Sequence, residues 1–393
     1  MDIAEAVILE VEIERILPGG IGLAHAEGRT VFVPLAAPGD LLKVRIVRVR
    51  GKTVFASIVE VLGPSPVRVE PPCPYFGRCG GCDFQQLRYD AQLRAKSEMI
   101  RDCLYRIARI ENPPEVSVVA SPRAWRYRAR ANWQLDPANR TVGYFERGSH
   151  EVCDVADCAV LVPELEEVLE KVRTNLPEAQ LNELAEIEAV AGDTGVSVAP
   201  AIADFRTQDV TRRIGDETYQ FSAKCFFQIN HDLLDRLVTA AVGEAQGENA
   251  IDLYCGVGLF TLPLARRFSQ VVGIESDAPA CRYARRNLTN AGLDNAKIIN
   301  AKVGVRLKHG GSSLKHFDFL VLDPPRTGAE PEVVQGILAL QPGRISYVSC
   351  DPATLARDLK DLLAGGYSFE SVAALDMFPQ THHVETVVHL LRR

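Results

Sequence analysis

Hydrophobic and polar residues alternate over roughly the first sixty positions of the chain, in short stretches bounded by turn residues. The stretches VILEVEIERI, GGIGLAHAEGRTVFVPL and DLLKVRIVRVRGKTVFASIVEVL place apolar side chains at about every second residue. Gly-Gly, Glu-Gly, Pro-Gly-Asp and Arg-Gly lie between or within them. A period of two with such turns is typical of half-buried β-strands. The pattern therefore predicts a small OB-like β-barrel over residues 1–65.

The character of the chain changes after this region. The proline-rich segment GPSPVRVEPPCP ends the strands, and the spacing after it predicts a helix over residues 89–110. Residues 114–222 are rich in strand-like patterns, with one acidic helix expected near residues 163–173. We therefore expect a central mixed α+β domain over residues 66–222.

The C-terminal part follows a third pattern. The stretches NAIDLYC, QVVGIES, FDFLVLD and RISYVSC are almost wholly apolar, and helix-length segments separate them. Strands that are buried on both faces have this appearance in a parallel sheet covered by helices. We predict an α/β fold class, with a Rossmann-like, mainly parallel doubly wound sheet over residues 223–393.

Size and composition are those of an ordinary globular protein with more than one domain. The chain has 393 residues, of which 47% are hydrophobic and 24% charged. Its first residues do not form a signal peptide and no stretch is apolar enough to cross a membrane, so a cytoplasmic protein is expected. In a cytoplasmic protein the ten cysteines are not expected to form disulfides, so they need another role: core residue, metal ligand or nucleophile.

Charge is distributed unevenly along the chain. The net charge is −7, yet residues 88–148 carry 12 Arg and Lys against 7 Asp and Glu, whereas residues 149–200 carry 2 against 12. A basic face on an acidic protein can bind nucleic acid. Charge alone leaves RNA binding and an ordinary solvated surface equally open. Candidate phosphate contacts on the predicted barrel are Lys43, Arg45, Arg48, Arg50 and Lys52.

Three further basic residues lie in the segment WRYRARANW. Arg126, Arg128 and Arg130 alternate at strand spacing, which would place them on one face. We predict that this face lines an RNA path, with a solvated strand face as the alternative.

A Gly-x-Gly turn in DLYCGVGLFTLPLA indicates a cofactor site. Gly256 and Gly258 follow a strand and precede an apolar helix, where the backbone can approach a ligand. Glu275 ends the next strand, about 20 residues later, where an acid can bind ribose hydroxyls. Thr261 replaces the third glycine of the dinucleotide fingerprint. The site therefore favours S-adenosylmethionine over a dinucleotide.

The next strand ends in Asp323-Pro324-Pro325-Arg326. Methyltransferases that act on exocyclic amines tend to carry Asn-Pro-Pro-aromatic at this place. An aspartate followed by arginine favours a different target atom, although two prolines also serve as a rigid turn.

Two residues near the C-terminus are candidates for catalysis. Cys350 ends the strand RISYVSC, and the helix that starts at Asp351-Pro352 is expected to favour its thiolate. A buried structural cysteine is the commoner case, but the position at a strand end favours a nucleophile. Glu385 in HHVETVV could remove a proton, although by itself it reads as an exposed residue.

The cysteines of CPYFGRCGGCDF suggest a metal site. Cys73, Cys79 and Cys82 form a C-x5-C-x2-C motif, with glycines that allow tight turns. Both tetrahedral zinc and a 4Fe-4S cluster need a fourth ligand, for which Cys153 and Cys158 compete. Spacing does not separate the two metals. The remaining cysteines are interpreted as core residues: Cys103, Cys225, Cys255 and Cys281.

Five motifs, FFQIN, DLYCGVG, DPPR, SCDP and HHVET, occur in this order. Together they resemble the RNA 5-methyluridine (uracil-C5) methyltransferases, a class I S-adenosylmethionine-dependent family. The resemblance covers nearly the whole chain, because that family also carries an N-terminal TRAM β-barrel and an iron-sulfur cluster. It implies transfer of a methyl group from S-adenosylmethionine to C5 of a uridine in RNA, through a covalent adduct of a cysteine with C6.

The resemblance also implies residue roles. Cys350 matches the nucleophile and Glu385 the general base, while Phe226 is a candidate to hold a base that has left its stack. Including the two glycines of the turn, the cofactor-binding positions are Gln228, Tyr254, Gly256, Gly258, Glu275 and Asp323. The context DVADCAVLVP resembles that of the family's fourth cluster ligand, so the implied ligands of the 4Fe-4S cluster are Cys73, Cys79, Cys82 and Cys158.

Three alternatives remain open. Ribosomal (23S) RNA is favoured as substrate over transfer RNA. The protein is expected to be a monomer, and no protein partner is implied. The enzyme could instead methylate another atom, such as cytosine C5 or an exocyclic amine. A protein of the same fold that binds RNA without activity is a different class, which the presence of both Cys350 and Glu385 disfavours.

Overall fold

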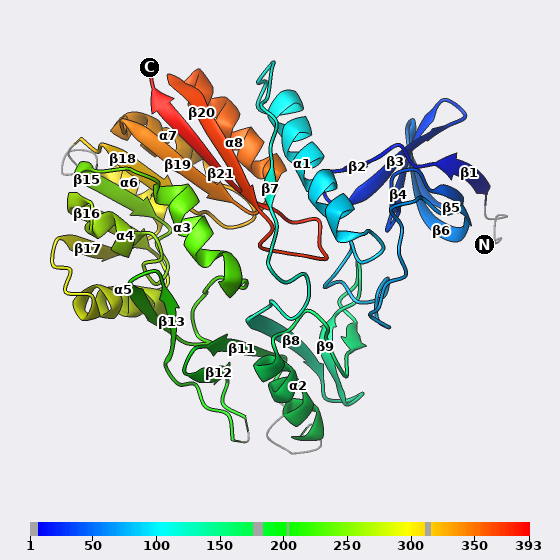
Figure 1. Ribbon diagram of the computed structural model, residues 1–393, viewed down its shortest axis with the longest axis horizontal. Coiled ribbons are helices and arrows are strands. Elements are labelled where there is room, and N and C mark those ends of the chain that lie inside the picture. The colour runs from blue at the N-terminus through cyan, green and yellow to red at the C-terminus, as the bar shows by residue number, and fades with distance from the viewer. Residues whose placement is uncertain (1–6, 176–183, 203, 311–315) are drawn as a thin grey trace.

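The computed structural model describes residues 7–175, 184–202, 204–310 and 316–393. Their strands form three main sheets and one separate hairpin, and the largest sheet is covered by helices (Figure 1). None of the helices in these ranges is long and apolar enough to span a bilayer.

The N-terminal sheet confirms the predicted β-structure. Its six strands have the order β1-β5-β6-β4-β3-β2, and alternate apolar side chains such as Val31, Val33 and Val44 form its core. The sheet lies at one side of the molecule, against the start of helix α1 (Figure 1). The strands are β1 (Ile8–Glu12), β2 (Arg15–Leu17), β3 (Ile21–Ala26), β4 (Arg29–Pro34), β5 (Leu41–Arg50) and β6 (Thr53–Gly63).

The central region contains a five-stranded antiparallel sheet in the order β10-β9-β8-β11-β12. The acidic helix α2 (Pro163–Asn175), predicted near residues 163–173, packs on it through Leu165, Val168 and Leu169. A hairpin, β13 and β14, follows. The strands are β8 (Arg130–Asp136), β9 (Thr141–Phe145), β10 (Val152–Asp154), β11 (Glu186–Gly192), β12 (Gly195–Ala199), β13 (Val210–Ile214) and β14 (Glu217–Phe221).

The C-terminal sheet has eight strands in the order β17-β16-β15-β18-β19-β21-β20-β7. The strands from β17 to β19 are parallel, as predicted, whereas β21 runs antiparallel to both of its neighbours. The strands are β7 (Val118–Val119), β15 (Gly247–Leu253), β16 (Phe268–Glu275), β17 (Ala296–Asn300), β18 (Phe319–Leu322), β19 (Arg344–Ser349), β20 (Tyr367–Leu375) and β21 (Glu385–Arg392).

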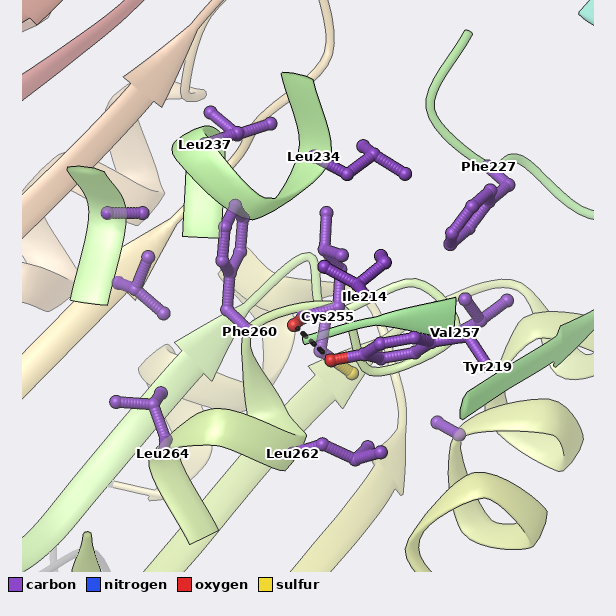
Figure 2. Close-up of a cluster of buried hydrophobic side chains, with 14 of the residues drawn as sticks. Ile214, Tyr219, Phe227, Leu234, Leu237, Cys255, Val257, Phe260, Leu262 and Leu264 are labelled. Carbon is purple, nitrogen blue, oxygen red and sulfur yellow. Dashed lines mark hydrogen bonds between the residues drawn. The ribbon is translucent and has the colours of Figure 1, made fainter. Parts of the chain in front are cut away.

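Helices cover both faces of this sheet, which makes it doubly wound. One core gathers α3, α4 and α5, and Figure 2 shows part of it, including the hydrogen bond from the Tyr219 hydroxyl to the Leu259 carbonyl. The other core gathers α1, α6, α7 and α8. The helices are α1 (Tyr89–Arg106), η2 (His231–Leu233), α3 (Leu234–Val242), α4 (Thr261–Ala265), α5 (Ala278–Asn290), α6 (Val303–Gly310), α7 (Pro331–Leu340) and α8 (Pro352–Ala364).

One feature of this arrangement differs from the predicted organisation. Helix α1, which ends at Arg106 and not at residue 110, packs against α8, and β7 pairs with β20. Both elements come from the segment expected to form the central domain. The predicted domain bounds stay a prediction, but residues 89–119 supply part of the C-terminal sheet and its cover.

Candidate active site

The Gly-x-Gly turn follows β15 in a left-handed conformation that suits glycine. Gly256 has φ +53° and Gly258 φ +96°. A Cβ on Gly258 would lie 3.0 Å from Leu262 Cδ1, so this glycine also allows the turn to pack closely. The backbone N–H of Gly256 donates to Glu275 Oε2 at 3.0 Å. The acidic residue at the end of β16 is thereby held against the turn.

A cavity of about 550 Å³ opens beside this turn, at the carboxyl ends of β15, β18 and β19. Ligands of open α/β sheets bind at such an edge. The predicted site residues that line it are Gln228, Tyr254, Gly256, Asp323, Cys350 and Glu385. Gly258 and Glu275 do not line the cavity, and Glu275 reaches its border through Gly256.

Sheet topology brings the two catalytic candidates together. Cys350 directly follows β19, and Glu385 begins the antiparallel strand β21. Ser349 pairs with Thr386, so Cys350 and Glu385 occupy the next position of the same register. Glu385 is only 2% exposed. The interpretation of Glu385 as an exposed terminal residue is therefore wrong.

The surroundings of Cys350 raise the pKa of its thiol. Burial, followed by the negative charge of Glu385, raises the pKa of Cys350 to about 12, and Arg326 opposes this shift. The start of α8 is capped by Asp351, whose carboxylate accepts from the N–H groups of Ala353 and Thr354, both at 2.9 Å. The net effect of these surroundings is therefore opposite to the one that the helix start was expected to have, and the contribution of the helix itself stays a prediction.

Two carboxyl groups border the cavity, the half-buried Asp323 and the buried Glu385. Burial raises the pKa of Asp323 to about 7. Burial also raises the pKa of Glu385 well above its usual range, with a further contribution from Asp323, while Arg326 lowers it. Gln228 Nε2 donates to Asp323 Oδ2 at 3.3 Å. The positive charge of Arg326 is therefore the feature of this cavity that favours the ionised forms of both Cys350 and Glu385.

The three alternating arginines do not form one face. Arg128 and Arg130 line the cavity, and Arg130 donates to the Cys225 carbonyl at 2.7 Å. Arg126 has φ +53° and pairs with Glu166 at 2.8 Å, away from this lining. The prediction of a shared face is wrong for Arg126, because the regular strand starts only at Arg130.

Other residues also line the cavity, some of them without a role predicted from the sequence. Asn132 continues the period of two after Arg128 and Arg130, and this signal would have found it. Phe378 lies seven residues before Glu385 without a pattern that marks it. The candidate base-holding residue Phe226 is 60% exposed at the cavity, with the Arg130 guanidinium 5.8 Å from its ring centroid.

The four cysteines with a predicted metal role border a second, small cavity. This lining includes Cys73, Cys79, Cys82 and Cys158. Cys153, the competing ligand, is fully buried in the core of the central region. Within the described ranges, no group of three or more His, Cys, Asp or Glu side chains is gathered closely enough to hold a metal ion as placed. The structure therefore brings the four thiols to one cavity without closing a coordination shell.

The chemistry around this second cavity fits a thiolate-bound group. Three polar atoms at its border lack a hydrogen-bond partner, namely Gln85 Oε1, Arg128 Nε and the Tyr144 hydroxyl. Burial raises the pKa of Cys79 to about 11 and that of Cys82 to about 12. Thiols bind metals as thiolates, so loading would release protons.

The chain is similar to known proteins along nearly its whole length. A family model described as tRNA (uracil-5-)-methyltransferase matches residues 164–393, which is more than half of the chain. The chain belongs to this family. A second model, for the TRAM domain of tRNA (uracil(54)-C(5))-methyltransferase, matches residues 9–67. The N-terminal β-structure is thus a TRAM domain.

Individual relatives agree with this membership. The 23S rRNA (uracil(1939)-C(5))-methyltransferase RlmD of Pectobacterium atrosepticum is 33% identical, over 98% of this chain and 93% of the relative. An uncharacterized RNA methyltransferase of Gloeobacter violaceus is 32% identical, over 97% and 96%. The crystal structure of Pyrococcus abyssi tRNA (uracil-54, C5)-methyltransferase with S-adenosyl-L-homocysteine has a TM-score of 0.74 and 28% identity, covering 97% and 100%. Family and fold confirm the predicted enzyme class, an S-adenosylmethionine-dependent RNA methyltransferase.

Proposed function

We propose that this enzyme methylates C5 of a uracil in RNA, with Cys350 as nucleophile and Glu385 as general base. The observation that carries the proposal is the register of β19 and β21, which sets a thiol and a carboxyl side by side. Both border one cavity beside the Gly-x-Gly turn. A nucleophile, a base and a cofactor turn at one site are the parts that this reaction requires.

Cys350 and Glu385 carry out different steps of the reaction. The Cys350 thiolate adds to C6 of the uracil, which pushes electron density onto C5. S-adenosylmethionine, when bound, supplies an electrophilic methyl group, and the bond from sulfur to this methyl breaks as C5 takes it. Glu385 then removes the proton from C5. The electron pair of that C–H bond restores the C5–C6 double bond, and the thiolate of Cys350 leaves.

Because burial favours the protonated forms of Cys350 and Glu385, ionising these two groups is the main obstacle to the reaction. Burial raises the pKa of Cys350 to about 12 and also raises that of Glu385, which disfavours the ionised form of both groups. Each must be ionised for its step. Arg326 lowers both pKa values by its charge, and we assign it the role of favouring these ionised forms.

The cofactor and the target uracil are assigned to different groups of residues. The turn with Tyr254, Gly256 and Gly258 and the acid Glu275 fit an adenosine and its ribose. Gln228 and Asp323, joined by a hydrogen bond of 3.3 Å, are assigned to the cofactor as well. Phe226 is exposed and borders the cavity, where its ring can stack on a base extruded from the RNA.

The RNA class is part of the proposal, and ribosomal (23S) RNA is the first candidate. The curated relative from Pectobacterium named above methylates 23S rRNA by its name, whereas the solved neighbour is named for tRNA. Nucleoside mass spectrometry of 23S rRNA and tRNA from a strain lacking the protein separates the two. Loss of one 5-methyluridine from 23S rRNA is expected. Loss from tRNA alone would contradict ribosomal specificity, and no loss from either RNA would contradict the proposal.

The second cavity supports a 4Fe-4S cluster on Cys73, Cys79, Cys82 and Cys158. The support is the shared cavity, the soft donor set and the unpartnered polar atoms at its border. When bound, such a cluster would order the cysteine-bearing segment, residues 73–82. No step of methyl transfer involves the cluster.

A further inference from the structure

An irregular segment, residues 376–384, joins β20 to β21 and leads directly into Glu385. It has no strand or helix of its own to fix its position. Partners more than 250 residues earlier in the chain hold it. The Tyr127 hydroxyl donates to the Pro379 carbonyl at 2.9 Å, and Lys96 forms a fully buried ion pair with Asp376 at 2.5 Å.

Of the hydrogen bonds between residues 376–384 and distant parts of the described chain, the ones nearest to Glu385 are made by Asp83, the residue after Cys82. The Asp83 carboxylate accepts the backbone N–H of His382 at 2.8 Å and contacts His382 Nδ1 at 2.5 Å. The N–H groups of Asp83 and Phe84 both donate to the Gln380 carbonyl at 3.0 Å. Four hydrogen bonds thus tie Asp83 and Phe84, which directly follow the cysteine-bearing segment, to residues three and five positions before the base.

We propose that Asp83 and His382 are positioning residues, which clamp residues 376–384 so that Glu385 can take the proton from C5. The inference rests on the proposed function. Glu385 is buried at the start of a strand. Its carboxyl group can therefore reach the substrate only when the backbone at residue 385 is correctly placed. Misplacement of a catalytic group by about 1 Å can cost on the order of 100-fold in rate.

The contacts of Asp83 with His382, here called the clamp, should affect proton removal more than the other steps of the reaction. Cys350 follows β19, which is paired with β18 on one side and with β21 on the other, whereas residues 376–384 have no strand pairing of their own. Thiolate addition and methyl transfer should therefore survive loss of the clamp, while proton removal slows. The distinguishing signature is a methylated RNA that stays covalently bound to the enzyme.

The experiment compares Asp83→Ala and His382→Ala in the full-length enzyme, with two RNAs. With uridine RNA we expect turnover to fall by roughly 10- to 100-fold, with a covalent adduct visible on denaturing gels. With 5-fluorouridine RNA, which needs no proton removal to form its adduct, the rate of adduct formation should stay within about two-fold of the wild-type rate. His382→Ala should be milder, because the backbone N–H to Asp83 remains.

Two further variants control for general damage. His382→Asn restores a side-chain donor near the position of Nδ1 and should recover most of the turnover. Asp154→Asn disrupts another ion pair of the central region, between Asp154 and Arg173, and should not accumulate adduct. Iron content and Tm of each variant separate loss of the clamp from loss of the cluster or of folding, and His382→Ala leaves the cysteine-bearing segment unchanged.

The outcomes are distinct. Wild-type turnover in both alanine variants, or an equal loss of adduct formation and turnover in His382→Ala, would overturn the clamp. Absence of an adduct between the wild-type enzyme and 5-fluorouridine RNA would overturn the proposed chemistry, and the clamp with it.

Discussion

Cys350 and Glu385 lie side by side because β21 is inserted antiparallel between β19 and β20. In a wholly parallel sheet, the start of a strand would lie at the edge opposite to the end of its neighbour. The reversal of β21 instead brings its first residue to the edge where β19 ends. A residue at the start of one strand and a residue at the end of another therefore share one cavity.

Arg326→Gln tests the electrostatic role assigned to this arginine. In the proposed mechanism Cys350 and Glu385 must lose protons, and Arg326 lowers both pKa values. Without its charge these pKa values rise, so the ascending limb of kcat/KM against pH should move to higher pH by roughly 0.5 unit. Arg326→Lys should keep the limb near its original position. A limb that does not move in Arg326→Gln would contradict the role, whatever happens to the maximal rate.

Glu275→Gln tests the cofactor site. The carboxylate already accepts the Gly256 N–H at 3.0 Å, and its second oxygen contacts the Asp277 N–H at 2.7 Å. Loss of its charge should weaken S-adenosylmethionine binding by roughly 10-fold, because hydrogen bonds from ribose hydroxyls to a charged group are the stronger ones. Isothermal titration calorimetry measures this. An unchanged Kd would remove Glu275 from the cofactor site.

The cluster prediction separates Cys158 from Cys153. Anaerobically purified protein should be brown and carry about four irons per chain. Cys158→Ser should lose most of this iron, whereas Cys153→Ser should keep it, because Cys153 lies in the hydrophobic core and not at the cavity. Iron and sulfide analysis checks both variants. Stoichiometric zinc without visible absorbance, or iron loss in Cys153→Ser alone, would contradict the assignment.

Asp252→Asn tests a buried acid beneath the cofactor turn. Burial raises the pKa of Asp252 to about 8, against about 4 in an unfolded chain. Between these two pKa values only the unfolded chain loses this proton, so the free energy of unfolding falls as pH rises. The stability that protonated Asp252 contributes is full below about pH 4 and is lost as pH rises through about 8. The amide keeps the contact with Thr261 Oγ1, which is 2.6 Å for Asp252, and does not titrate.

The variant should therefore lose less Tm between pH 5 and pH 9 than the wild type, by about 3–6 °C. Asp361→Asn, at an exposed position of α8, should follow the wild-type curve. Identical slopes for wild type and Asp252→Asn would contradict the raised pKa.

The local patterns predicted the parallel core well and the catalytic electrostatics poorly. Apolar strands such as β15 and β19 are visible in the sequence because burial on both faces dictates their composition. The pKa of Cys350 is set by tertiary burial and by Glu385, which lies 35 residues away in the sequence. A local rule about helix starts could not include either effect, nor the cap that Asp351 provides.

The long-range contacts were also beyond the sequence patterns. The separation between Asp83 and His382 is 299 residues, and no periodicity links them. Arg126 shows the opposite failure, since its spacing fits a strand but its φ of +53° interrupts one. Period and spacing indicate which residues can share a face only where the backbone remains regular.

The most direct test of the central claim is the identity of the residue that bonds to RNA. Glu385→Gln enzyme should form a methylated covalent adduct with uridine RNA, because addition and methyl transfer proceed while proton removal is blocked. After nuclease and protease digestion, mass spectrometry should find 5-methylated uridine attached to Cys350, and Cys350→Ala should form neither adduct nor product. A nucleotide attached to another residue, or substantial methylation by Cys350→Ala, would contradict the account.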